Sequence, residues 1–239
     1  MDKRRIFFIS ALHFWMDIYS LFFPVYMVIA GLDPVKSALI AGVGSALGNG
    51  LQPLMGFVAD RLYRAGPRIG RLPVFVGLVL GATCMSLIGV TRSYPLLFVL
   101  VAVGRLGVSL FHPGAASDAG RAAGGAGSGT RTAFGLSVFL AIGTVGMALS
   151  QPYFSALTAW LGNASSGLLA IPAVALAMVD LVSQGAEGQV VPAHVDFSQA
   201  GRILLGRLGV LGLLLLIMIL RYGYITAVGF FAAKLFADW

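Results

Sequence analysis

Two polar side chains, His13 and Asp17, lie one helical turn apart inside a long apolar run near the N-terminus. Arg105 and Arg221 interrupt two later apolar runs, and His112 follows Arg105 in the same run. Each charge at the centre of a bilayer costs roughly 2.5–3.5 kcal/mol on insertion scales. Arginine lowers the pKa of a neighbouring carboxylate and burial raises it, so a site balanced between the two can gain and lose a proton as the arginine moves. Histidine titrates near neutral pH unaided. These five residues therefore predict a pathway for protons and substrate.

The depth of each residue follows from a helical rise of about 1.5 Å per residue. His13 and His112 are expected roughly 10 and 8 Å from the cytoplasmic surface, and Asp17, Arg105 and Arg221 roughly 16, 18 and 20 Å from it. We therefore expect three spans to line one polar cavity. Other interpretations stay open: a structural Asp17–Arg105 ion pair, histidines that only bind backbone groups, or a metal site of the two histidines and Asp17. The favoured interpretation includes no metal or other cofactor.

The composition indicates a membrane protein. Of the 239 residues, 58% are hydrophobic and 10% are charged, and the mean hydropathy is +0.91, whereas soluble domains carry about 25% charged residues. The net charge of +7 does not indicate nucleic acid, because the basic residues fall between apolar runs. The single cysteine, Cys84, excludes an internal disulfide. The expected partners are the lipid bilayer, a small-molecule substrate and protons.

Seven apolar runs approach the roughly 20 residues that a helix needs to cross a bilayer. They cover residues 6–32, 37–59, 72–91, 94–117, 132–158, 165–182 and 208–233. We expect an all-α membrane protein with a six-helix bundle in 1–182, a cytoplasmic linker in 183–203 and a seventh transmembrane helix in 204–239. Lys and Arg gather before the first span and after the second, fourth and sixth. This predicts that the N-terminus lies in the cytoplasm. The expected location is the plasma (inner) membrane.

Prolines and paired glycines mark places where the spans could bend. Pro24, Pro113 and Pro152 each remove a backbone hydrogen bond and are expected to loosen a helix. Segments 44–48 and 77–81 begin and end with glycine, which permits close helix contact. Rocking helices and ordinary packing explain these two segments equally well.

Residues 56–71, GFVADRLYRAGPRIGR, lie between the second and third predicted spans and resemble the cytoplasmic loop signature of the major facilitator superfamily. The matching positions are Gly56, Asp60, Arg61 and Arg64. Tyr63 and Ala65 stand where the family usually has a glycine and a basic residue. The resemblance implies a gating loop in which Asp60 caps a helix and neutralises charge, the two arginines pin helix ends, and Gly56 permits close approach.

Residues 104–124, GRLGVSLFHPGAASDAGRAAG, together with HFWMDIYS at 13–20, resemble the fosmidomycin-resistance subfamily of drug efflux carriers. In this resemblance Arg105 matches a helix-four arginine linked to proton coupling, and Asp17 matches an acidic site in helix one.

Residues 137–152, SVFLAIGTVGMALSQP, resemble the helix-five motif of drug/proton antiporters. The matching residues are Gly143, Gly146 and Pro152, and Gln151 stands where the motif normally has glycine.

The resemblance implies a carrier of twelve helices in two halves, which exports a drug or other small molecule as protons enter. The chain would then hold the first half plus helix seven, a truncated or split carrier that needs a partner half or forms a homodimer. A truncated, non-transporting membrane scaffold or sensor is the alternative. An enzyme is not expected, because Ser20, a candidate nucleophile, lies two helical turns from His13.

Overall fold

The computed structural model describes residues 1–125 and 129–183, together with residues 205–210, 212, 213, 216, 217, 220, 224, 227, 228, 231 and 232. These residues form helices and turns and contain no strand. The chain divides into two compact units, residues 1–190 and 191–239. The first unit contains α1 (Lys3–Ile18), α2 (Phe22–Ile29), α3 (Pro34–Gly50), α4 (Gln52–Ala65), α5 (Pro67–Gly70), α6 (Leu72–Ser86), η1 (Leu87–Val90), α7 (Tyr94–Ala123), α8 (Gly129–Leu161), η3 (Asn163–Ala170) and α9 (Ile171–Ser183).

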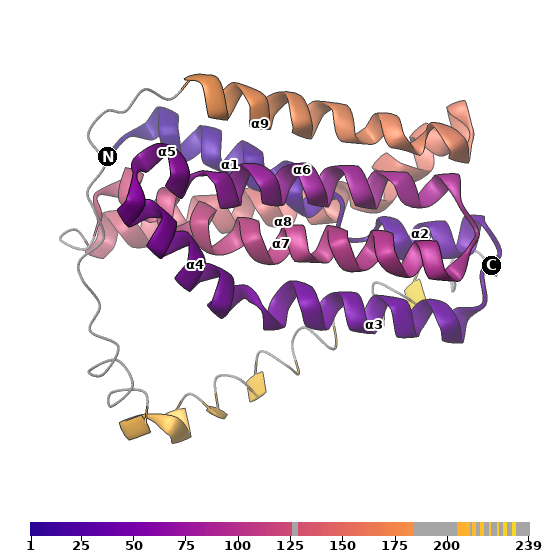
Figure 1. The fold of residues 1–239 in the computed structure, drawn as a ribbon, viewed down its shortest axis with the longest axis horizontal. Coiled ribbons are helices and arrows are strands. Elements are labelled where there is room, and N and C mark those ends of the chain that lie inside the picture. Colours follow the sequence, from indigo (N-terminus) through magenta and orange to yellow (C-terminus); the bar gives the residue numbers. More distant parts are fainter. Residues whose placement is uncertain are drawn as a thin grey trace. The chain divides into compact units, whose positions relative to one another are not determined.

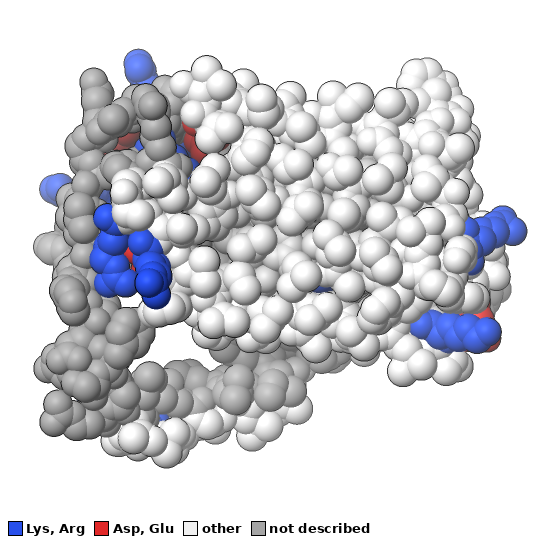
Figure 2. Space-filling view, in the orientation of Figure 1, with Lys and Arg blue, Asp and Glu red and all other residues white. Residues whose placement is uncertain are grey.

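Five segments of the described chain are long and apolar enough to cross a membrane. They are Lys3–Ile29, Leu72–Val90, Tyr94–Ala123, Gly129–Leu161 and Asn163–Val182. Their helices run side by side, and α7 contacts α1, α3, α4, α6 and α8 (Figure 1). Figure 2 shows charged side chains gathered at the two ends of the helices, with a nearly uncharged face between them. The described residues are all-helical, and five segments that could cross a membrane support the prediction of a multi-pass membrane protein.

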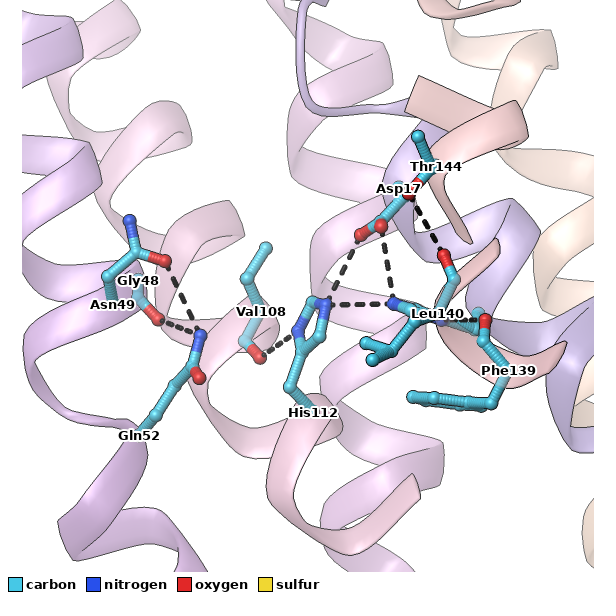
Figure 3. A network of polar contacts seen from close by, with 10 residues as sticks. Asp17, Gly48, Asn49, Gln52, Val108, His112, Phe139, Leu140 and Thr144 are labelled. Atoms are coloured by element: carbon cyan, nitrogen blue, oxygen red, sulfur yellow. Dashed lines mark hydrogen bonds and ion pairs between the residues drawn. The ribbon is translucent and has the colours of Figure 1, made fainter. Parts of the chain in front are cut away.

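The second predicted span, 37–59, is not one helix. α3 ends at Gly50 and α4 begins at Gln52, so Leu51 separates helices of 17 and 14 residues. The cause is Pro53, which cannot donate to the carbonyl of Asn49 and whose ring crowds that carbonyl. Beside the break, the Gln52 side chain donates to the Gly48 carbonyl at 3.1 Å (Figure 3). Figure 1 shows α4 leaving the line of α3 at an angle.

The first predicted span also breaks, between α1 and α2, at residues 19–21. Pro24 accounts for the position of the break, because the carbonyl four residues earlier, that of Ser20, has no intrahelical donor. The expected loosening at Pro24 is therefore seen as a break. Pro113 and Pro152 interrupt nothing, since both lie inside continuous helices, α7 and α8. Both helices also extend beyond the predicted spans.

The paired glycines are packing positions. A Cβ on Gly77 would lie 2.6 Å from the carbonyl oxygen of Gly107, and one on Gly107 would lie 2.5 Å from that of Gly77. α6 and α7 therefore touch backbone to backbone. Gly44 and Gly48 bring α3 against α7, because a Cβ on Gly44 would lie 2.7 Å from Val101 Cγ1 and one on Gly48 would lie 3.3 Å from the Arg105 carbonyl oxygen. Of the two interpretations left open by the sequence, packing accounts for these contacts.

The second unit contains the seventh predicted span, and its described residues are helical except for a turn residue, Arg207. Residues 184–203 of the predicted linker and Arg221, a predicted pathway residue, lie outside the described residues.

Candidate functional site

His13 and Asp17 from α1 and His112 from α7 form one cluster of side chains inside the first unit. His13 Nε2 lies 3.2 Å from Asp17 Oδ2, and His112 Nε2 lies 3.2 Å from Asp17 Oδ1. The two Nε2 atoms are themselves 3.2 Å apart. Figure 3 shows Asp17 and His112 facing one another across this cluster. The structure therefore brings together three of the five predicted pathway residues.

The outer nitrogens of both imidazoles are bound to backbone carbonyls. His13 Nδ1 is 2.8 Å from the Phe139 oxygen, and His112 Nδ1 is 2.9 Å from the Val108 oxygen (Figure 3). A carbonyl only accepts, so these contacts assign the hydrogen to Nδ1 in both rings. In neutral histidine Nε2 is then an acceptor, and the two nitrogens and the carboxylate are three acceptors facing one another. At least one additional proton or another cation must lie among them for the contacts to be attractive.

The sequence interpretation in which the histidines only bind backbone groups is thus incomplete, because each also contacts Asp17. The sequence could predict that His13 and Asp17 lie together, since positions four apart share a helix face. The contact with His112 depends on how α1 and α7 are rotated against each other.

The His13 ring is held in place by α8. It stacks on Phe139 with ring centroids 3.9 Å apart and planes 12° from parallel. The ring also occupies the space above Gly143, where any Cβ would collide with it. The second glycine of the helix-five-like motif, Gly146, faces the backbone of Phe14 just as closely. Both glycines are thus contact positions between α1 and α8, and Gly143 makes room for the His13 ring.

Changing Gly143 to alanine is expected to displace the His13 ring and to lower the free energy of unfolding by about 1–3 kcal/mol, the usual effect of overpacking. The measurement is thermal unfolding in detergent. A double-mutant cycle makes the test specific, because in a His13→Ala background the new methyl group has space and should cost nothing. An equal loss in both backgrounds would contradict the assigned contact.

Arg105 does not pair with Asp17. Its Nη2 donates to the Ser20 carbonyl at 2.7 Å, the same carbonyl that Pro24 leaves without an intrahelical donor. A cation at the C-terminal end of a helix is also favoured by the helix dipole. Arg105 therefore caps the broken joint between α1 and α2. The structural Asp17–Arg105 ion pair, one of the interpretations left open by the sequence, is not among the ion pairs of the described residues. The guanidinium is still near enough to interact electrostatically with Asp17 and His112.

The loop signature at 56–71 is mostly helical, because α4 continues to Ala65 and α5 follows. Asp60 lies inside α4 and caps no helix, which corrects the expected role. In the described part of the chain, Asp60, Arg61 and Arg64 are exposed and no hydrogen bond or ion pair fixes them. Gly56 does face a neighbour closely, since a Cβ there would lie 3.3 Å from Pro113 Cβ.

Charged side chains do join α1, α7 and α9 near the N-terminus of α1, and the sequence had not singled them out as site residues. Arg5 of α1 donates to Asp118 of α7 and, at 2.5 Å, to Asp180 of α9. Arg121 adds a second contact to Asp118 at 3.3 Å and lies 4.2 Å above the ring of Tyr63. The signal that could have found them is Asp180, an acidic residue within the sixth predicted span.

Comparison with known proteins adds no identification: no family model, no curated protein and no solved structure matches this chain.

Proposed function

We propose that this protein is a proton-coupled membrane transporter of the major facilitator type, which exports a small molecule or drug by alternating access. One observation supports this most: His13, Asp17 and His112 direct three acceptors at one another between membrane-spanning helices. Such a site needs a proton to be stable and changes charge when the proton leaves. The resemblances of residues 56–71, 104–124 and 137–152 supply the transporter class. In this proposal the protein lies in the inner membrane with its N-terminus in the cytoplasm.

The coupling step follows from the position of Arg105. This side chain holds the α1–α2 joint through the Ser20 carbonyl and interacts electrostatically with the neighbouring cluster. When the cluster loses its proton, its negative charge attracts Arg105 and competes with the carbonyl for the guanidinium. A proton arriving from outside releases this attraction. Proton binding would thus tighten the joint between α1 and α2, and proton loss would loosen it. Alternating access needs a hinge of this kind.

The test replaces Asp17 with asparagine, which keeps the shape of the side chain but cannot bind the transported proton as a carboxylate does. Protein in liposomes loaded with a pH-sensitive dye receives a pH gradient and then fosmidomycin, the drug for which the resembling subfamily is named. Wild-type protein is expected to move protons when the drug is added, and Asp17→Asn is expected to lose this response.

The matched control is Asp33→Asn, the same chemical change at an exposed helix cap where asparagine serves equally well. Asp33→Asn is expected to behave as wild type. An undiminished response in Asp17→Asn would reject the role of the cluster. A wild-type protein that moves no protons with fosmidomycin or with a panel of cationic and zwitterionic drugs would favour the scaffold or sensor alternative.

A further inference from the structure

We propose that His13, Asp17 and His112 bind one divalent transition-metal ion of the zinc class in the interior of the first unit. The inference goes beyond proton-coupled export, since it concerns a second kind of occupant for the same three side chains. These three residues are also the one group of histidine, cysteine and acidic side chains in the described chain whose donor atoms come together closely enough for a metal, all within 4.8 Å.

The spacing of the donor atoms fits a small tetrahedral ion. Zinc binds imidazole nitrogen and carboxylate oxygen at about 2.0–2.2 Å, which puts neighbouring ligand atoms of a tetrahedron about 3.3–3.6 Å apart. The three contacts measured here, Nε2 to Nε2 and each Nε2 to one carboxylate oxygen, are 3.2 Å each. An ion can therefore enter with side-chain adjustments of a few tenths of an ångström.

The orientation of both imidazoles is already that of metal ligands. A ligating histidine usually donates its other ring nitrogen to a carbonyl or carboxylate, which fixes the ring and its tautomer. His13 and His112 both do so, through the carbonyls of Phe139 and Val108. The stacked Phe139 ring and the bare backbone of Gly143 further restrict His13. The lone pairs of both Nε2 atoms point into the cluster without any rearrangement.

The donor set indicates the class of ion. Two imidazoles and one carboxylate suit zinc, cobalt and nickel, whereas magnesium and calcium prefer oxygen ligands. Three protein ligands leave a fourth position for water or another ligand. Exposure agrees with an accessible site, because the His13 side chain is 3% exposed but those of Asp17 and His112 are 18% and 22% exposed. Arg105 is the nearby positive charge, and it weakens the binding of a cation.

The experiment titrates untagged, metal-free protein in detergent with Co²⁺ and Zn²⁺, with no substrate and no pH gradient. Expected results are one ion per chain, the visible absorption of tetrahedral cobalt, and a higher Tm with Zn²⁺, since a ligand stabilises the state that binds it. His13→Gln, His112→Gln and Asp17→Asn should each weaken binding about 100-fold, at least as much as loss of an outer partner of a metal ligand does. His194→Gln, which changes the remaining histidine of the chain, should bind as wild type.

Size-exclusion profiles and Tm values in the absence of metal identify any variant that fails to fold. If Asp17→Asn fails to fold, Asp17→Glu serves as the second variant at that position, because it keeps a carboxylate ligand and should retain binding. Wild-type affinity in His13→Gln or His112→Gln, or binding that disappears only in His194→Gln, would overturn the proposal. This titration uses no pH gradient, so the two proposals are tested separately. A failure to bind metal would not contradict proton coupling, and a failure of proton coupling would not contradict metal binding.

Discussion

Replacing Arg5 with methionine is expected to lower the free energy of unfolding by about 3 kcal/mol, because it removes the cation that two buried carboxylates share. Arg5 lies between Asp118 and Asp180, and the three side chains are 12%, 11% and 6% exposed. The change is predicted to lower Tm in detergent by about 6–12 °C. Methionine keeps most of the apolar stem of arginine, so the measurement reports mainly on charge.

Arg4→Met is the matched control, because Arg4 is exposed and neighbours Arg5 in the same helix. Its Tm should change little. Adding Asp180→Asn to Arg5→Met should restore part of the lost stability, since it removes one of the two carboxylates that Arg5 contacts. Equal Tm values for Arg4→Met and Arg5→Met would show that the α1–α7–α9 ion pairs contribute nothing measurable.

Replacing Gly107 with alanine is expected to cost about 1–3 kcal/mol by overpacking. The new methyl group would lie 2.5 Å from the Gly77 carbonyl oxygen and 2.6 Å from the Gly81 backbone nitrogen. Backbone atoms cannot rotate away as a side chain can, so α6 and α7 must separate. The measurement is again Tm in detergent.

Gly42→Ala is the control for Gly107→Ala. Gly42 also lies within a helix, α3, and a Cβ added there would meet no atom within 4 Å. Alanine there should leave stability unchanged or raise it, because alanine favours a helix over glycine by up to about 1 kcal/mol. If both variants lose the same stability, helix propensity rather than contact between α6 and α7 governs these positions.

The two stability predictions concern opposite kinds of contact. At one end of the bundle, Arg5 joins three helices through charge. Along its length, glycines such as Gly77 and Gly107 let helix backbones meet. In a bilayer, lipid is as apolar as the helix surfaces, so close packing and polar contacts contribute much of the helix association. The candidate site lies between these regions and depends on both for the positions of α1 and α7.

The sequence by itself determined that the protein is an all-α membrane protein and which charged residues are worth testing. Long apolar runs have one stable solution in lipid, the helix, because every backbone group must find a partner within its own segment. The same constraint draws attention to the charges of Asp17 and Arg105, because they lie within apolar runs. The i, i+4 spacing also placed His13 and Asp17 on one face, since that relation is local to one helix.

Only the tertiary structure decided which polar groups meet. Asp17 meets His112, and Arg105 meets the Ser20 carbonyl, because helix rotation and the break near Pro24 set the reach of each side chain. Hydropathy does not encode either quantity, since it records how apolar a segment is and not which way it faces. The Arg5–Asp118–Asp180 contacts also depend on tertiary packing. They join residues far apart in the chain, and only the packing of α1, α7 and α9 brings them together.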